Sequence, residues 1–301
     1  RQKFTLGALV NAYITLGYKI SYALNKINGI EDSRKEKIHE DFVNYYNLKS
    51  LDTNEQIHKF MRRIYTQIND TISIVENEFS DIALKLYLSL ALQINDIKVD
   101  RNLYEEYCYN ALSSAIQIFN RGKINDEIKI DLINQVIGTV LNIDILSRDN
   151  LVAITSNIVQ VSQSLLKRSD QSIAILNCSH LFYKTLVADS NKILDCLNKA
   201  KKFADYAMTN PKNAILFIKI INKYLFFIEK SESDDSIDFI NPETINDLIE
   251  LVKNHIQSMK IENKDAEFLP VIEEYYNNTI YLISQRKKEG SNKVLEGIMI
   301  G

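Results

Sequence analysis

The chain has 301 residues, 46% of them hydrophobic and 25% charged, and its formal net charge is -3. This balance of 36 basic and 39 acidic residues excludes the basic surface typical of proteins that bind nucleic acid. With 8 glycines and 3 prolines, the sequence has few of the residues that form tight turns, which disfavours β-sheet architectures. The composition predicts an all-α protein, longer than one compact core usually supports.

The longest apolar runs reach only about five or six residues, far below the roughly 20 that a membrane-spanning helix needs. No membrane-spanning helix is therefore expected. Three cysteines, Cys108, Cys178 and Cys196, have apolar neighbours, which favours buried thiols in a reducing compartment. Because the chain begins at Arg1 rather than Met, we expect a piece of a longer protein.

The first predicted helix spans residues 4–27, where apolar residues recur at spacings of three and four. Residues 28–52 are charged, have a weaker apolar pattern and are interpreted as an irregular insertion. Thr53 and Gln56 have the spacing of a capping box, which predicts the start of the next helix.

From residue 81 onward the pattern becomes regular. Polar capping residues precede most of the predicted helix starts, which fall near Asp81, Asn102, Asp126, Asp149, Ser169, Ser190, Lys212, Pro242 and Asp265. Alternate starts, at 81, 126, 169 and 212, recur with the period of about 40 to 47 residues typical of HEAT and armadillo hairpins. The sequence therefore predicts a HEAT-like helical-hairpin solenoid over residues 1–301, a right-handed superhelical array of antiparallel helix pairs.

The stretch 165–229 organises this prediction, because it can be divided into three helices. The first is expected from Gln171 to Val187, with Ser169 or Asp170 as its cap. The second has one apolar stripe, formed by Ile193, Leu197, Ala200, Ala204 and Ala207. The third, from Ala214 to Ile228, is apolar almost all round. Its polar residues share one narrow stripe and are Lys219, Asn222 and Lys223. Such a helix must be covered on several sides.

The end of the chain is predicted to hold two more long helices and a tail. Asn241 is expected to cap a helix that has Pro242 at its first position. The last long helix is expected from Glu267 to Arg286, before Gly290. The tail, residues 290–301, has an apolar end that either folds back or binds something.

The sharpest sign of an enzyme is the spacing DDxxD, formed by Asp234, Asp235 and Asp238. All-α terpenoid synthases use such carboxylates to hold magnesium against a diphosphate. Asn69 and Ser73 match two places of a second site, but position 77 is Asn rather than an acid. A solvated acidic loop is the favoured interpretation, and the magnesium-dependent enzyme is kept as an alternative.

A zinc site at Cys178, His180 and Cys196 would lack a fourth ligand, so buried thiols are favoured there. His39, His58 and His255 are not near a cysteine or paired carboxylates in the sequence. We therefore predict no cofactor, no metal and no catalytic residue.

Aromatic residues give the sequence its candidates for binding a protein partner. Those selected are Phe182, Tyr183, Tyr224, Phe227 and Tyr276. On the concave surface of a solenoid they would serve as anchors for the partner. Core packing is the alternative for each of them, because apolar spacing does not distinguish inward from outward side chains.

Several collinear segments resemble one family. They are RQKFTLGALV at residues 1–10, IGT at 137–139, LLKRSDQSIAILNCSHLFY, KILDCLNKAKKFAD, FIKIINKYLFFIEK and the terminal LEGIMI. In order and spacing they are similar to the C-terminal half of the large α-solenoid subunit of retromer, the vacuolar protein sorting-associated protein 35 family. No single motif is diagnostic, but the collinear set is specific.

The resemblance implies a non-enzymatic scaffold of a coat that retrieves cargo from endosomes to the Golgi or the plasma membrane. Its concave face would hold the metallophosphoesterase-fold subunit, whereas the N-terminal half, absent from this sequence, would hold the arrestin-like subunit. Lys199 and Lys202 match a basic helix face associated with homodimer contacts, although Asn198 departs from the family's lysine. A solvated helix face is the alternative for these lysines. The implied location is cytoplasmic, peripheral on endosome membranes, and another helical-repeat adaptor remains the alternative function.

Overall fold

A computed structural model describes residues 2–27, 54–121, 124–183, 186, 188–208, 210–231, 240–262, 267–290 and 293–300. Every regular element in these ranges is a helix, which confirms the predicted all-α class. The predicted insertion at 28–52 and the acidic trio at 234–238 lie outside the described residues. The chain divides into two compact units, 1–161 (unit 1) and 162–301 (unit 2).

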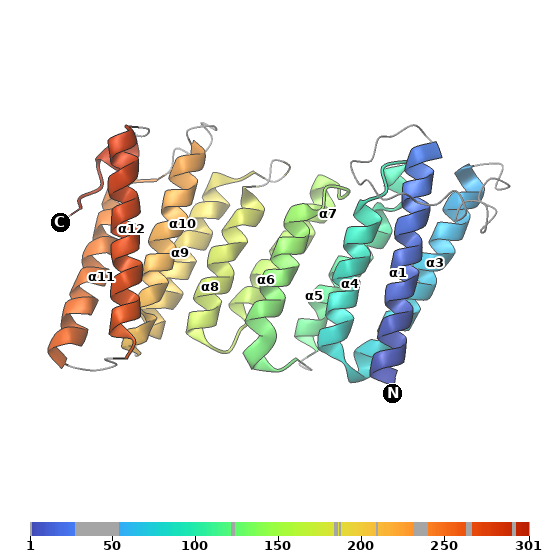
Figure 1. Cartoon of the computed structure of the whole chain (residues 1–301), viewed down its shortest axis with the longest axis horizontal. Coiled ribbons are helices and arrows are strands. Elements are labelled where there is room, and N and C mark those ends of the chain that lie inside the picture. The colour runs from blue at the N-terminus through green and yellow to red at the C-terminus, as the bar shows by residue number, and fades with distance from the viewer. Residues whose placement is uncertain are drawn as a thin grey trace. The chain divides into compact units, whose positions relative to one another are not determined.

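Unit 1 is built from two layers of helices. Its elements are α1 (Gln2–Ile27), α3 (Asn54–Glu78), α4 (Ser80–Asn95), the 3₁₀ turn η2 (Arg101–Leu103), α5 (Glu105–Asn120), α6 (Asp126–Asn142) and α7 (Arg148–Gln163). Helices α1, α4 and α6 pack side by side in one layer, and α3 and α5 pack against them from the other (Figure 1).

Unit 2 repeats this layout. Its elements are α8 (Arg168–Cys178), η3 (Ser179–Phe182), α9 (Ser190–Ala207), η5 (Pro211–Ala214), α10 (Ile215–Ser231), α11 (Pro242–Glu262), α12 (Leu269–Glu289) and the short α13 (Lys293–Glu296). Helix α10 packs between α8 and α12 in one layer, and α9 and α11 form the other (Figure 1). Stacked antiparallel pairs within each unit confirm the helical-repeat class. One continuous right-handed array over 1–301 stays a prediction.

The predicted helix starts agree closely with the structure. Helices α4, α6 and α8 begin at Ser80, Asp126 and Arg168, and the turn before α10 begins at Pro211, each within one residue of the prediction. The predicted cap of α11 is also present, since Asn241 Oδ1 accepts a hydrogen bond from the Glu243 amide at 2.9 Å. Side-chain caps are also present at Asn125 of α6 and Asp189 of α9, whereas α4, α5, α8 and α12 begin without one, and α12 begins at Leu269 rather than near Asp265.

The predicted helix from 171 to 187 is wrong in length and in its cap. Helix α8 ends at Cys178 and tightens into η3, where Ser179 Oγ donates to the Leu176 carbonyl at 2.6 Å. The Asp189 amide then donates to the Phe182 carbonyl at 3.0 Å. These bonds satisfy carbonyls at the end of the helix without further α-helical turns. At the other end Lys167 occupies the cap position and makes no side-chain cap bond.

Burial follows the predicted stripes. The α9 stripe of Ile193, Leu197, Ala200, Ala204 and Ala207 is buried, as predicted. A Cβ at Gly17 of α1 would lie 2.8 Å from Oε1 of the buried Gln93 on α4, so a larger residue there would require the Gln93 side chain to move. The glycine lets two neighbouring helices approach around a buried amide.

A buried asparagine joins successive hairpins in unit 1. Asn95 Nδ2 donates to the Asn142 carbonyl at 3.2 Å, and Asn95 Oδ1 accepts from the Asp144 and Ile145 amides at 2.9 and 3.1 Å. Arg101 reaches the same Oδ1 at 3.4 Å and also pairs with Asp144. We call Asn95, Arg101, Asp144 and this turn the Asn95 cluster. It satisfies backbone groups that the end of α6 would otherwise leave without partners.

The C-terminal tail folds back, which was one of its two predicted fates. Leu295 and Ile298 are buried, and Asn246 of α11 holds the backbone around them. Its side chain donates to the Gly297 carbonyl at 3.1 Å and accepts from the Met299 amide at 2.7 Å. The tail therefore covers one end of unit 2.

Candidate functional site

A pocket of about 350 Å³ opens in unit 2 between α8, α10 and α12. We call it the α10 pocket. Its lining residues are Ile173, Leu176, Asn177, His180, Lys219, Asn222, Lys223, Phe226 and Tyr275. None of them is acidic, and two are lysines. The pocket therefore carries positive charge between largely apolar walls.

Helix α10 presents these polar groups because of its sequence period. Asn222 and Lys223 follow Lys219 by three and four residues, so all three share one face of the helix. Other faces are fully covered, with Phe217, Ile218 and Phe227 all at 0% exposure. This is the narrow polar stripe that the sequence predicts, and its spacing alone indicates no function.

His180 and Lys223 form the most unusual contact in the pocket. Lys223 Nζ lies 2.5 Å from His180 Nε2, and because an ammonium only donates, the ring nitrogen accepts. Burial, with the neighbouring Lys223 charge, lowers the pKa of His180 to about 4. Burial also lowers the pKa of Lys223 to about 8. At neutral pH the histidine is neutral and most of the lysine is charged.

No Asp or Glu is among the described residues that line the pocket, and burial is the cause of the lowered pKa of Lys223. Asn222 adds a further donor. Its side-chain amide contacts Thr279 Oγ1 of α12 at 3.1 Å, and this hydroxyl, which has one proton, also lies 3.1 Å from the Tyr275 carbonyl. The pocket thus offers donors from two lysines and one amide, the chemistry that recognises an anion.

Aromatic rings form one wall of the α10 pocket. Phe226 meets His180 edge-on, with ring centroids 4.8 Å apart. Tyr183 packs against Phe226 and Phe227 at 6.2 and 6.1 Å. These contacts hold the imidazole in place beside Lys223.

The five aromatic residues predicted to bind a partner fall into two groups. Phe182, Tyr224 and Phe227 are buried in unit 2, at 6%, 2% and 0% exposure, so they pack the core, the alternative that the sequence left open. Tyr183 and Tyr276 are half-buried and keep accessible surface. Partner contacts therefore stay a prediction for these two, and only Tyr183 lies next to the α10 pocket.

The lysines predicted for a homodimer contact lie on the solvent-facing side of α9. Lys199 pairs with Asp195 at 2.7 Å, one helical turn away. Lys202 is exposed, with Nζ 5.9 Å from the centre of the Tyr206 ring. Both are placed as the apolar stripe predicts, and their contact with a second chain stays a prediction.

The zinc alternative gains no support from the part of the chain that the structure describes. There, no group of three His, Cys, Asp or Glu side chains lies close enough to hold a metal ion. Cys178 and Cys196 are buried free thiols, and burial raises the pKa of Cys178 to about 12. His180 instead binds Lys223, as described above.

Other polar residues weighed in the sequence have ordinary surroundings. Buried His58 lies between Asp100 Oδ2, at 2.9 Å, and the Tyr104 hydroxyl. His255 stacks on Phe217, with ring centroids 6.2 Å apart. Asn69 and Ser73 are exposed residues of α3. His39 lies outside the described residues.

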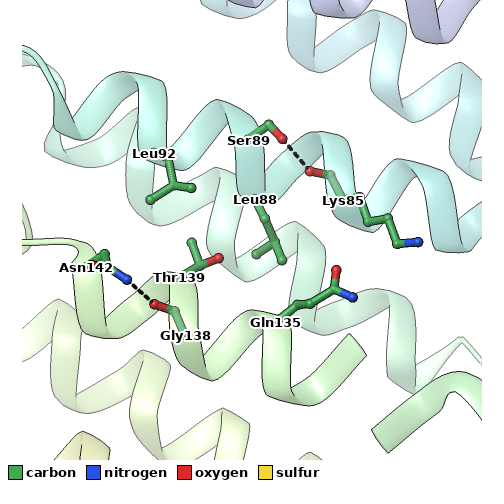
Figure 2. A pocket seen from close by; sticks show the side chains of 8 residues that line it. All are labelled: Lys85, Leu88, Ser89, Leu92, Gln135, Gly138, Thr139 and Asn142. Carbon is green, nitrogen blue, oxygen red and sulfur yellow. Dashed lines mark hydrogen bonds between the residues drawn. The ribbon is translucent and has the colours of Figure 1, made fainter. Parts of the chain in front are cut away.

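Unit 1 has a pocket of its own between α4 and α6, with a volume of about 430 Å³. Figure 2 shows two of its polar side chains bonded to their own helices: Ser89 Oγ donates to the Lys85 carbonyl at 3.0 Å, and Asn142 Nδ2 donates to the Gly138 carbonyl at 2.7 Å. Lys85 is the only charged residue that lines it. This pocket therefore lacks the clustered donors of the α10 pocket.

The stacked helix pairs define the class of the protein as a helical-repeat protein. No described helix is both long and apolar enough to pass through a membrane. A family model, Vacuolar protein sorting-associated protein 35, matches residues 1–255, and the chain belongs to this family.

Curated relatives agree with this assignment. The chain is 28% identical over 208 residues to Vacuolar protein sorting-associated protein 35B of Arabidopsis thaliana, covering 65% of the chain and 25% of that protein. It is 25% identical over 253 residues to the 35C protein of the same plant, covering 79% and 30%. With Vacuolar protein sorting-associated protein 35 of Schizosaccharomyces pombe it shares 24% over 229 residues, covering 73% and 26%. The chain thus spans under a third of the length of these relatives.

Proposed function

We propose that this chain is a non-enzymatic scaffold segment of the retromer coat, which retrieves cargo from endosomes to the Golgi or the plasma membrane. The family match over residues 1–255 carries the proposal. The two-layer stacking of helix pairs supports it, because such repeats present long surfaces to other proteins. The proposed location is cytoplasmic, peripheral on endosome membranes through the coat.

The proposed partner of this segment is the metallophosphoesterase-fold subunit of retromer, held on the concave face of the repeat. Tyr183 and Tyr276 are the aromatic candidates with accessible surface for such a contact. The arrestin-like subunit is proposed to bind the part of the family's longer chains that this sequence does not match.

Co-elution on size exclusion tests this assignment. The purified chain, mixed at micromolar concentration with the metallophosphoesterase-fold subunit, is expected to elute with it as one complex. The arrestin-like subunit serves as the matched control, because it should elute alone. Separate elution of the metallophosphoesterase-fold subunit would contradict the proposal, and identifying proteins that co-purify from cells would then test for another adaptor role.

A homodimer through α9 is a second part of the proposal. Lys199 and Lys202 lie on its exposed face, so charge reversal of both to Glu should shift a dimer to monomer in sedimentation. The control is Lys253→Glu, an exposed lysine on α11. An unchanged oligomeric state in the double variant would remove these lysines from the dimer contact.

A further inference from the structure

We propose that the α10 pocket binds the C-terminal carboxylate of a partner polypeptide whose last residue is apolar. Lys219, Asn222 and Lys223 would donate to the carboxylate, and the walls from α8 and α10 would cover the side chain. This inference goes beyond the scaffold proposal and does not depend on it.

The charge of the pocket favours an anion. Lys219 and Lys223 lie one helical turn apart, a spacing at which like charges repel. Lys223 is also partly removed from water, and the contact it makes is with the neutral His180 ring rather than with a carboxylate. A bound anion would offset both the repulsion and the loss of hydration.

Asn222 adds a directional hydrogen-bond donor beside the two lysines. Its side-chain amide contacts Thr279 Oγ1 at 3.1 Å and brings an N–H donor to the helix face that carries both lysines. His180 acts as a positioning residue, because its contact with Nζ holds the Lys223 side chain at the pocket. The donors are thus arranged before any ligand arrives.

Size and wall chemistry favour a chain terminus over other anions. A volume of about 350 Å³ lies at the low end of ligand pockets, roughly 300–1,000 Å³, so one or two side chains fit. Ile173, Leu176 and Phe226 give the pocket apolar walls. A terminal apolar residue carries a carboxylate and an apolar side chain on one carbon and meets both features. An internal acidic residue needs a neighbour for the apolar contact, and phosphate leaves the walls unused.

Binding of a short peptide tests the proposal. The probe is fluorescein-Gly-Gly-Leu-Leu with a free C-terminal carboxylate, titrated with the whole 301-residue chain and followed by anisotropy. The same peptide with a C-terminal amide should bind about tenfold more weakly, because it lacks the charged acceptor. Lys223→Met should weaken the free-acid peptide by about tenfold and Lys219→Met by about threefold.

Controls separate the pocket from general charge and from loss of fold. Lys253→Met removes an exposed lysine of α11, outside the pocket, and should leave the affinity unchanged. Lys223→Arg keeps the charge and should bind within a few fold of the parent chain. Circular dichroism checks that each variant retains its helices.

Several results would overturn the proposal. The first is that the parent chain does not bind the free-acid peptide, and the second is that the amide binds as tightly as the free acid. The third is that folded Lys223→Met binds the free acid as tightly as the parent chain does. If acetyl-Gly-Leu-Asp-Leu-amide competes as well as the free-acid peptide, the carboxylate is internal rather than terminal. If inorganic phosphate competes better than either peptide, the site is a phosphate site. Retromer subunits are absent from this assay, so its failure leaves the co-elution test unaffected.

Discussion

The Asn95 cluster of unit 1 and the α10 pocket of unit 2 both place polar side chains where successive hairpins meet. In the first, Asn95 bonds to three backbone groups of one turn, and Arg101 pairs with Asp144. In the second, Lys223 contacts the neutral His180 ring, and no lining residue is acidic. Polar groups with fixed partners stabilise a helical repeat, whereas a lysine buried without an anion lowers its stability. The difference separates a structural junction from a site that can receive a ligand.

The largest effect is expected at the Asn95 cluster. Asn95→Ala should lower the free energy of unfolding by about 3 kcal/mol, because the Asp144 and Ile145 amides and the Asn142 carbonyl lose their partner. Urea unfolding followed by circular dichroism measures the change. Asn157→Ala, at an exposed position of α7, is the matched control and should change stability by less than about 0.5 kcal/mol. Equal effects of the two substitutions would show that the cluster is not a structural junction.

A substitution in the α10 pocket is expected to raise the free energy of unfolding rather than lower it. Lys223→Met should raise the free energy of unfolding at pH 7 by about 2 kcal/mol, because burial lowers the pKa of this lysine from 10.5 to about 8. The unfolded chain binds the proton more tightly between pH 8 and 10.5, so the stability of the parent chain should rise across that window. The variant should lose this part of the rise.

Urea unfolding at pH 7 and pH 10 measures the effect of Lys223→Met. Lys253→Met removes an exposed lysine of α11 and should leave stability within about 0.5 kcal/mol of the parent at both values. A destabilised Lys223→Met would mean that Lys223 has a structural role like that of Asn95, and the comparison would fail.

Sequence reasoning predicts the helical class and most helix starts because capping residues and apolar spacing act locally. Asp126 and Ser190, for example, begin helices where the sequence places them. The α8 helix was predicted too long, because its end depends on a 3₁₀ turn and on a bond from the distant Asp189 amide. Such contacts cannot be read from periodicity.

The candidate site was predictable only in part. The polar stripe of Lys219, Asn222 and Lys223 is visible in the sequence, and it lines the pocket. Its partner His180 lies 43 residues from Lys223, and only the packing of α8 against α10 joins them. Buried and exposed aromatic residues look alike by spacing, which is why Phe227 was proposed as a partner contact but lies in the core.

A smaller effect is expected at acidic pH. Burial and the Lys223 charge lower the pKa of His180 from 6.5 to about 4, so the unfolded chain binds the proton more tightly between these values. This histidine therefore makes stability fall as pH drops from 6.5 to 4 and contributes no loss above 6.5. His180→Phe should reduce the fall by about 1 kcal/mol, after allowance for its partial exposure.

The measurement for His180→Phe is the change in unfolding free energy between pH 7.5 and pH 4.5, compared with the same change in the parent chain. Comparing changes rather than absolute values removes the contribution of carboxylates that titrate in both chains. It also removes any loss of packing that is the same at both pH values. Parallel pH profiles would show that His180 is not held in a neutral form by the pocket.

The smallest effect is expected at Asn246, which makes the same kind of contact as Asn95 but near solvent. Asn246 binds the Gly297 carbonyl and the Met299 amide, whereas water can replace either bond if the side chain is removed. Asn246→Ala should therefore lower global stability by less than about 1 kcal/mol. Hydrogen exchange at the Met299 amide should nevertheless become several-fold faster, because the tail opens locally. Asn254→Ala, at an exposed position of α11, is the control and should change neither quantity. If Asn246→Ala destabilises the chain as much as Asn95→Ala, neither burial nor the larger number of bonds is what gives the Asn95 cluster its strength.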